Sequence, residues 1–201
     1  MPTRSPTPWD LPPKPAEGDA AKTGIWTAVG AALSAWGEYE SELGRLFTIC
    51  VTWDYPSPQL MRAFGAVRTF EGRRDMLRGA SEGFFSLNRW ASSRQAAMKE
   101  IIREGSKAFE RRNELAHGIV MPFRPEGSTE PAGFCLMPSY YDMKKRQVHS
   151  GLPDYSYTAA NIEVFRAGFE ALARPPHELA NHLIREIRER RRGRSLPQWP
   201  V

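Results

Sequence analysis

Apolar residues recur at the spacing of an α-helix over an unusually long stretch of the chain, residues 22–51. A repeat of this period with one polar face predicts an amphipathic helix whose apolar face packs against the rest of the protein. The prolines in Tyr55-Pro56-Ser57-Pro58 end this helix and turn the chain. The inward-facing positions are Ile25, Val29, Ala32, Leu33, Trp36, Leu43, Leu46, Phe47 and Cys50.

Two further stretches show the same helical period. One runs from about residue 58 into the 80s, and its far end, at residues 79–90, is expected to bend or break. The other covers residues 92–117. Gly118 follows directly and is predicted to be the left-handed residue that ends this third helix, because glycine adopts positive φ without strain.

The pattern changes after Gly118. Short apolar runs at residues 119–123 and 133–137 flank a segment rich in Pro, Gly, Ser and Thr, which is typical of a β-hairpin. Thr158 then provides an N-cap for another helix. Pro175-Pro176 is expected to divide that helix from a last one, since proline begins helices and interrupts their interiors.

These patterns predict an all-α fold, a helical bundle of about five helices with a small β-hairpin insertion after the third helix, at about residues 119–137. With 201 residues, 41% of them hydrophobic, the chain can bury one good-sized core. We therefore expect a single helical domain over residues 21–192. Residues 1–20, with six prolines, are expected to form a disordered tail, and residues 193–201 a C-terminal tail.

Glycines recur every seven residues within the first two predicted helices. Each costs a helix about 1 kcal/mol relative to alanine. Two interpretations are open: the glycines let two helix backbones approach closely, or their spacing is a coincidence. The positions are Gly30, Gly37, Gly44, Gly65, Gly72 and Gly79.

Charge and cysteine content restrict the class of protein. The net charge of +5 and the pI near 9.4 permit a polyanionic partner such as nucleic acid without requiring one. Cys50 and Cys135 lie far apart, so neither a disulfide framework nor a zinc site is implied, and we expect no metal and no cofactor. No apolar run approaches the roughly 18 residues of a membrane span. We expect a soluble, cytoplasmic protein with no membrane partner.

Arg112 is the most unusual residue of the third predicted helix. At about 100° per residue it falls within the apolar stripe, where an unpaired charge costs several kcal/mol. It is expected either to pair with a carboxylate, of which Glu40 is the best candidate, or to line a cleft. The stripe consists of Met98, Ile101, Ile102, Gly105, Ala108, Phe109 and Ala116.

His117 falls on the flank of that stripe, more than a quarter-turn from Arg112, with Asn113 one turn before it. A histidine in a last helical turn is also favoured by the helix dipole alone, so a purely structural role is an alternative. If Arg112 and His117 act on one phosphate, either the last turn distorts or a symmetric homodimer brings the two groups together from two chains.

The run Glu110-Arg111-Arg112-Asn113-Glu114-Leu115-Ala116-His117-Gly118 resembles the signature of the HEPN superfamily, in which an arginine, a polar residue and a histidine close a long helix. The resemblance implies a helical core over about residues 22–190. Many members are metal-independent endoribonucleases that act as dimers in toxin–antitoxin or phage-defence systems, alongside an antitoxin or another partner protein. Other members are non-catalytic modules that bind a nucleotide or a protein, and that is the alternative.

Carried over to this sequence, the resemblance implies that Arg112 and His117 are catalytic and that Asn113 is the intervening polar residue. In that chemistry the ribose 2′-OH attacks the adjacent phosphorus, His117 moves a proton, and Arg112 stabilises charge on the phosphoryl oxygens. Only RNA provides this nucleophile. Asn113 is placed to orient the His117 ring or to contact the phosphate, whereas Glu114 is expected to be solvated.

A basic run near the C-terminus is a weaker candidate for contacts with the RNA backbone. Its residues are Arg190, Arg191, Arg192 and Arg194. Pairing at i, i+4 with neighbouring glutamates on a solvated helix end explains most of this run without RNA. His177 and His182 are one residue too far apart for the two-histidine helix of zinc proteases, so no metal site is expected there.

Four tyrosines flank the predicted insertion. They are suited to stacking on nucleic-acid bases, but packing of the insertion against the helices is the favoured interpretation. The residues are Tyr140, Tyr141, Tyr155 and Tyr157.

Overall fold

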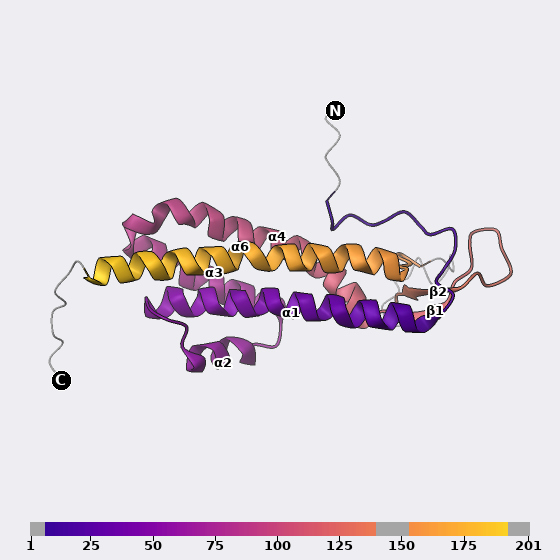
Figure 1. The fold of residues 1–201 in the computed structure, drawn as a ribbon, viewed down its shortest axis with the longest axis horizontal. Helices are drawn as coiled ribbons and strands as arrows, with labels where there is room; N and C mark the ends of the chain where they lie inside the picture. Colours follow the sequence, from indigo (N-terminus) through magenta and orange to yellow (C-terminus); the bar gives the residue numbers. More distant parts are fainter. Residues whose placement is uncertain (1–6, 140–152, 193–201) are drawn as a thin grey trace, which may run out of the picture. The chain divides into compact units, whose positions relative to one another are not determined.

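The computed structural model describes residues 7–139 and 153–192. The elements follow one another in the order shown in Figure 1: α1 (Lys22–Thr52), α2 (Pro58–Ala66), α3 (Phe70–Leu87), a short 3₁₀ turn (Arg89–Ala91), α4 (Ser92–His117), β1 (Ile119–Pro122), β2 (Phe134–Met137) and α6 (Ala159–Arg192). The predicted all-α fold with a small antiparallel hairpin is confirmed for the described residues.

The chain packs as two compact units. We call residues Met1–Gly37 with Ser106–Ala171 unit 1, and residues Glu38–Gly105 with Leu172–Val201 unit 2. The unit boundaries fall inside α1 and α4 and within α6, so each of the three long helices contributes residues to both units.

The second predicted helix is two helices in the structure. Ser57 caps α2 by accepting a hydrogen bond from the backbone N–H of Leu60, and the helix ends where Val67 turns to an extended conformation. Thr69 then caps α3, accepting from the N–H of Gly72. The break expected at residues 79–90 occurs at Asn88, whose side-chain amide donates to the carbonyl of Phe84 at 2.8 Å.

The predicted division at Pro175-Pro176 is wrong, because α6 continues through both prolines. Proline removes a backbone donor and crowds the preceding turn, which normally breaks a helix. Here Arg174 and Glu178 form an i, i+4 ion pair at 2.8 Å across the prolines, and the core positions of unit 2 resume with buried Leu179. Packing on the apolar face thus outweighs the local preference of the two prolines.

In unit 1 the predicted hairpin is confirmed, with Ile119 opposite Met137 and Pro122 opposite Phe134. Two single bridges lie on the edge of β2 that does not face β1, where Asp19 pairs with Phe134 and Tyr157 pairs with Leu136.

Residues 7–20, expected to form a disordered tail, instead make specific contacts within unit 1. Trp9 stacks on Phe169 with ring centroids 5.4 Å apart, and a Cβ at Gly168 would lie 2.7 Å from the Trp9 ring. The carboxylate of Asp19 accepts a 2.7 Å hydrogen bond from the backbone N–H of Ala159, the first residue of α6. A proline-rich segment therefore lies against the unit, because one aromatic ring and one carboxylate have partners there.

The predicted N-cap of α6 is confirmed as well. The Thr158 hydroxyl accepts from the N–H of Asn161 at 3.3 Å, and the Asn161 side chain accepts from the N–H of Thr158 at 3.1 Å. This reciprocal pair satisfies donors that the first helical turn leaves free.

Gly118 does not have the predicted left-handed conformation. Among the described glycines, only Gly127 and Gly133 have positive φ. A Cβ at position 118 would lie 2.7 Å from the Glu114 carbonyl oxygen and 2.8 Å from Leu136. Glycine is required there for space, as the chain passes from α4 into β1.

The seven-residue glycine spacing does not mark close helix packing along its length. Gly30, Gly37, Gly65 and Gly79 face open space, where an added Cβ would meet nothing within 4 Å. Within the series, Gly44 of α1 does approach α2, because a Cβ there would lie 3.1 Å from the Phe64 ring. The tightest approach in unit 2 occurs at a glycine outside the series, Gly105 of α4. A Cβ there would lie 1.9 Å from the hydroxyl oxygen of Tyr39, which donates a 3.0 Å hydrogen bond to the carbonyl of Ile101.

Each unit has an aromatic core. In unit 1, Trp36 packs edge-on against Phe169 with centroids 5.4 Å apart. In unit 2, Phe47 stacks on Phe64 at 5.2 Å, and Phe84 meets the ring of Trp90 edge-on at 6.1 Å.

Both cysteines are buried and unpaired with one another. Burial raises the pKa of Cys50 to about 12 and that of Cys135 to about 11, so both thiols stay protonated near neutral pH. In the described ranges, none of the helices combines the length and the hydrophobicity that crossing a membrane requires.

Candidate functional site

The end of α4 carries the sequence motif, and the structure places its residues differently from the helical wheel. Arg111, not Arg112, is the buried arginine, with 3% of its surface exposed. Arg112 is half-buried and Ala116 is exposed, whereas Leu115 is buried. The buried face of the last two turns therefore runs through positions 108, 111 and 115. Ala108 belongs to the predicted stripe, whereas Arg111 and Leu115 lie about 100° around the helix from Arg112 and Ala116.

Arg111 is neutralised by carboxylates on its own helix. Its guanidinium lies 3.1 Å from Glu114 and 3.0 Å from Glu110. The same guanidinium donates a 3.1 Å hydrogen bond to the phenolic oxygen of Tyr157, and that hydroxyl donates to Glu114 at 2.6 Å. Arg111, Glu114 and Tyr157 thus form a closed polar triad, which we call the buried triad.

The expectation that Glu114 is solvated is wrong, because its carboxylate belongs to the buried triad. Burial raises the pKa of Glu114, although the hydrogen bond from Tyr157 and the charge of Arg111 act in the opposite direction. The pKa of Tyr157 is raised by burial and by its hydrogen bond to Glu114. The phenol therefore remains the donor over the physiological pH range.

The backbone at the end of α4 also forms hydrogen bonds with residues outside the helix. The carbonyl of Glu114 accepts hydrogen bonds from the N–H of Gly118 at 2.9 Å and from the hydroxyl of Tyr155 at 3.1 Å. Tyr155 stacks on Tyr157, with ring centroids 4.8 Å apart. The packing interpretation holds for these two tyrosines, while Tyr140 and Tyr141 lie outside the described residues. The last turn of α4 is therefore fixed by tertiary contacts.

Arg112 has a different environment from its neighbour. One terminal nitrogen of its guanidinium donates to the side-chain oxygen of Asn113 at 3.1 Å, and its Nε is buried without a hydrogen-bond partner. No acidic side chain within residues 7–139 and 153–192 forms an ion pair with it. Glu40, the predicted partner, instead pairs with Arg73 in unit 2 at 3.1 Å.

His117 is exposed in the last turn of α4. Five residues along an α-helix correspond to a rise of about 7.5 Å and a rotation that leaves the two side chains about 140° apart. The structure therefore brings Arg112 together with Asn113, and it does not bring Arg112 and His117 together within one chain.

Two arginines of the C-terminal basic run contact other parts of unit 2. Arg191 pairs with Asp54 at 2.7 Å and donates to the carbonyl of Trp53. The Arg190 guanidinium lies over the Trp90 ring, 4.7 Å from its centroid. Arg192 is exposed, and Arg194 lies outside the described residues.

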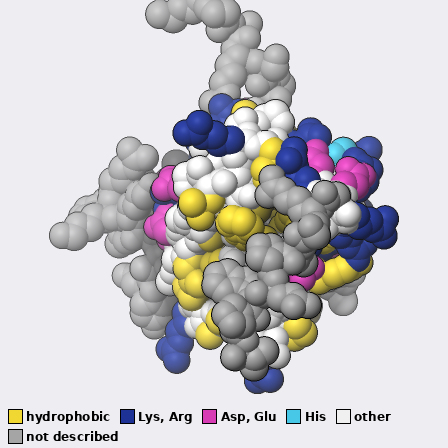
Figure 2. Space-filling view, turned by 90° about the vertical axis from the view of Figure 1, so that its left-hand side faces the viewer, with side chains coloured by type: hydrophobic (Ala, Val, Ile, Leu, Met, Phe, Trp, Pro, Cys, Tyr) yellow, Lys and Arg dark blue, Asp and Glu magenta, His cyan; other side chains and the backbone are white. Residues whose placement is uncertain are grey.

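Figure 2 shows one face of the molecule with the side chains coloured by type. Basic side chains gather toward one edge of this face, where acidic side chains lie among them, and hydrophobic side chains occupy its middle. This face carries both signs of charge. The described side chains of this face therefore do not form a surface of one charge sign, by which proteins attract a nucleic-acid backbone.

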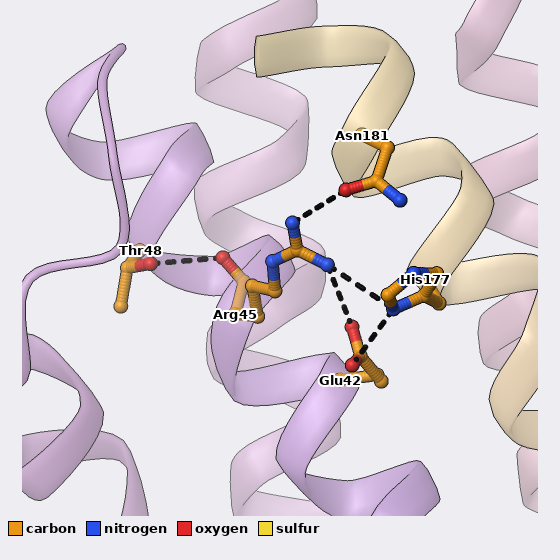
Figure 3. Close-up of polar contacts among 5 residues, drawn as sticks. All are labelled: Glu42, Arg45, Thr48, His177 and Asn181. Carbon is orange, nitrogen blue, oxygen red and sulfur yellow. Dashed lines mark hydrogen bonds and ion pairs between the residues drawn. The ribbon is translucent and has the colours of Figure 1, made fainter.

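A second polar cluster, which the sequence did not indicate, links α1 and α6 within unit 2 (Figure 3). The Arg45 guanidinium donates to the side-chain oxygen of Asn181 at 2.6 Å and lies 3.3 Å from Glu42. The Nδ1 of His177 is 3.1 Å from Glu42 and 3.2 Å from Arg45. When protonated it can donate to Glu42, and when unprotonated it can accept from Arg45.

The spacing of polar residues in each helix is visible in the sequence, at i, i+3 in α1 and i, i+4 in α6. The contact between the two helices, which joins residues more than 130 positions apart, cannot be predicted from that spacing. The His177 side chain is about half exposed, so the cluster contributes little to stability. The contacts of this cluster connect α1 to α6. The described residues contain no group of three or more His, Cys, Asp or Glu side chains that could hold a metal ion.

Comparison with known proteins returns no match. No model of a protein family, no curated protein and no solved structure is significantly similar to the chain. A functional assignment therefore depends on the chemistry of the residues themselves.

Proposed function

We propose that this protein is a metal-independent endoribonuclease of HEPN type in which Arg112 and His117 are catalytic and Asn113 is a supporting polar residue. The observation that carries the proposal is the contrast between two adjacent arginines. Arg111 is buried and paired with the carboxylates of Glu110 and Glu114, whereas the only described side-chain partner of Arg112 is the neutral amide of Asn113. The charge of Arg112 is thus left for an anion such as the RNA phosphate.

The proposed reaction follows from these groups. The 2′-OH of the ribose attacks the adjacent phosphorus and the bond to the 5′ oxygen of the next nucleotide breaks. His117 takes the proton of the attacking hydroxyl or delivers one to the leaving oxygen, and Arg112 stabilises the negative charge on the phosphoryl oxygens. The products are a 2′,3′-cyclic phosphate and a 5′-hydroxyl.

A homodimer is part of the proposal. Arg112 and His117 of one chain point in directions about 140° apart, so one phosphate is reached most easily by the arginine of one copy and the histidine of the other. The end of α4 would then lie near the two-fold axis. A role as a toxin or phage-defence component, held in check by an antitoxin or another partner protein, follows from the resemblance in sequence and is proposed with it.

One observation favours a second candidate. Because Arg112 and His117 do not meet within one chain, the end of α4 also suits a non-catalytic, HEPN-like module that binds a nucleotide phosphate or a partner protein. In that case Arg112 and Asn113 form the anion-binding pair, and His117 serves only as a helix-terminal residue.

Cleavage of RNA in the presence of EDTA separates the two candidates. The wild-type protein, Arg112→Ala and His117→Ala are each incubated with labelled RNA. Arg103→Ala and His182→Ala in unit 2 serve as matched controls. We expect cleavage by wild type and both controls, losses of at least about a hundredfold in the two motif variants, and cyclic-phosphate ends. Equal cleavage by all five proteins would show that contaminating nuclease, and not this site, cuts the RNA.

A further inference from the structure

Unit 1 contains a cavity of about 630 Å³ next to the hairpin. It is lined by the N-terminal segment, by β1 and the loop that follows it, and by the chain that leads into α6. This volume lies within the range of cavities that bind small ligands. The residues used in the argument are Lys14, Ala16, Met121, Phe123, Arg124 and Ser156.

The N-terminal wall of the cavity is fixed by backbone hydrogen bonds. The N–H of Gly18 donates to the carbonyl of Ala132 at 2.7 Å, and Asp19 and Phe134 exchange two bonds of 2.8 Å each. A Cβ at Gly18 would lie 2.5 Å from the backbone nitrogen of Phe134. The two backbones are thus in direct contact, which holds Lys14 and Ala16 close to the hairpin.

The part of the hairpin loop that lines the cavity includes a defined turn. The N–H of Ser128 donates to the carbonyl of Pro125 at 3.1 Å, with Gly127 at φ +81° in the third position. That conformation favours glycine and is typical of a type II turn. The loop is closed by two bonds between Phe123 and residues 132–133, of 2.8 and 2.9 Å.

Met121, Phe123 and Met137 form an apolar part of the cavity lining. Phe123, Cys135 and Met137 are buried in one cluster, and Met121 packs against it. Ser156, which is also buried, adds a hydroxyl that can both donate and accept. Lys14 and Arg124 also line the cavity and are exposed, and the acidic residue in the lining is Glu126. The cavity therefore combines an apolar interior, one hydroxyl and two cationic groups.

These features match one unpaired nucleotide better than an entirely apolar ligand. A base has apolar faces and a polar edge, and its phosphate carries the negative charge that Lys14 and Arg124 can bind. The cavity is also close to the motif along the chain. Met121 follows His117 by four residues, so their Cα atoms are at most about 14 Å apart. About four stacked nucleotides span that distance, at about 3.4 Å each.

We propose that this cavity binds a base of single-stranded RNA near the phosphate that Arg112 and His117 attack. The inference rests on the proposed function for the position of the cut, but binding can be measured without cleavage. The base enters against Met121 and Ser156, and the adjoining phosphates lie toward Lys14 and Arg124.

Filling the cavity without altering a charge is the direct test. Ala16→Trp places an indole at a lining position that is exposed, and Ala20→Trp places the same side chain on the same segment outside the cavity. The probe is a fluorescent, single-stranded RNA of about 12 nucleotides, within the usual site sizes, with 2′-O-methyl groups that block cleavage. Anisotropy then gives the dissociation constant.

We expect Ala16→Trp to weaken binding about tenfold or more, and Ala20→Trp to bind like wild type. Arg124→Glu should weaken binding as well, whereas Arg174→Glu, a reversal at an exposed position of α6 in unit 2, should have a much smaller effect. Thermal melting identifies any variant that is not folded. The charge variants keep the proposal testable if Ala16→Trp is unstable.

The proposal is overturned if wild type does not bind the RNA, if Ala16→Trp and Arg124→Glu bind as wild type does, or if the controls weaken binding equally. A proline-rich peptide that displaces the RNA from wild type but does not bind the two cavity variants would assign the cavity to a protein partner instead. If wild type binds this RNA through the cavity but does not cut unmodified RNA, the nuclease proposal fails and the cavity proposal stands. If wild type cuts RNA but Ala16→Trp and Arg124→Glu bind the probe as tightly as wild type, the cavity proposal fails and the nuclease proposal stands.

Discussion

The hydroxyl of Tyr157 donates a 2.6 Å hydrogen bond to the carboxylate of Glu114, and both groups also contact the guanidinium of Arg111. Tyr157→Phe removes the donor and leaves a largely buried carboxylate with one partner fewer. We expect the free energy of unfolding to fall by about 1–3 kcal/mol, measured by urea denaturation. Tyr55→Phe, at an exposed tyrosine of unit 2, should change it by less than about 0.5 kcal/mol. Equal effects of the two variants would mean that the buried triad does not stabilise the fold.

Glu114 also predicts a dependence of stability on pH. Burial raises its pKa in the folded state above the value of 4.5 for a free side chain, so the folded chain holds this proton more tightly. The resulting contribution to stability is fully present below pH 4.5 and is lost as the pH rises through the folded pKa. The unfolding free energy of wild type minus that of Glu114→Gln should therefore decrease over the pH range just above 4.5. A difference that increases with pH would contradict the raised pKa, and Glu130→Gln controls for the loss of an exposed charge.

Two glycines at helical positions should respond oppositely to alanine. Gly105→Ala forces a methyl group into the Tyr39 hydroxyl and should destabilise the protein by about 1–3 kcal/mol. Gly79→Ala points into open space on α3 and should stabilise it by about 0.5–1 kcal/mol, because alanine is the better helix former. Thermal melting of the two variants checks both signs. Stabilisation by Gly105→Ala would show that the two helices are not in close contact at Tyr39.

The prolines inside α6 should lower its stability. Pro175 is exposed, and alanine there restores a backbone donor within a continuous helix. We expect Pro175→Ala to raise the free energy of unfolding by up to about 3 kcal/mol. Pro131→Ala, in the hairpin loop of unit 1, is the control and should change it by less than about 0.5 kcal/mol. A lower melting temperature for Pro175→Ala would indicate that the proline conformation is needed.

The proposed two-chain site predicts complementation between inactive variants. When Arg112→Ala and His117→Ala chains exchange subunits, half of the dimers are mixed, and each mixed dimer has one intact arginine–histidine pair out of two. The mixture should regain about a quarter of wild-type activity in an RNA cleavage assay, although neither variant is active alone. Activity that stays at the level of the separate variants would place both groups of one site on the same chain. Light scattering before and after mixing confirms that dimers form.

The long helices and the hairpin could be predicted from local sequence patterns. The stretches 22–51 and 92–117 correspond to α1 and α4, and the two apolar runs after Gly118 form β1 and β2. The long helices can be predicted because the apolar period repeats many times along them. The hairpin can be predicted because it requires only two neighbouring segments.

Elements that depend on distant partners could not be predicted in the same way. Pro175-Pro176 indicates a break, but the apolar face of α6 continues on both sides of it and the helix persists. Residues 7–20 have the composition of a disordered tail. However, Asp19 binds the backbone of Ala159 at the start of α6, and Trp9 stacks on Phe169 further along the same helix. Composition describes what a segment prefers alone and not what it meets in the fold.

The candidate site shows the same limit at the scale of one residue. A helical wheel distinguishes Arg111 from Arg112 by only about 100°, and a long helix can change its buried face over several turns. The partner that decides between the two arginines is Tyr157, 46 residues beyond Arg111. The motif predicts where the candidate site lies, and the tertiary contacts determine which arginine is buried.

The hydrogen bond between Asp19 and the start of α6 has a consequence for the order in which the protein folds. These two groups are separated by 140 positions. During synthesis Asp19 leaves the ribosome long before its partner exists, so the N-terminal segment can dock only after most of the chain has been made. Contacts of such long range slow folding. One wall of the cavity at the hairpin is therefore expected to close among the last steps, and the nascent chain would lack the proposed RNA site until then.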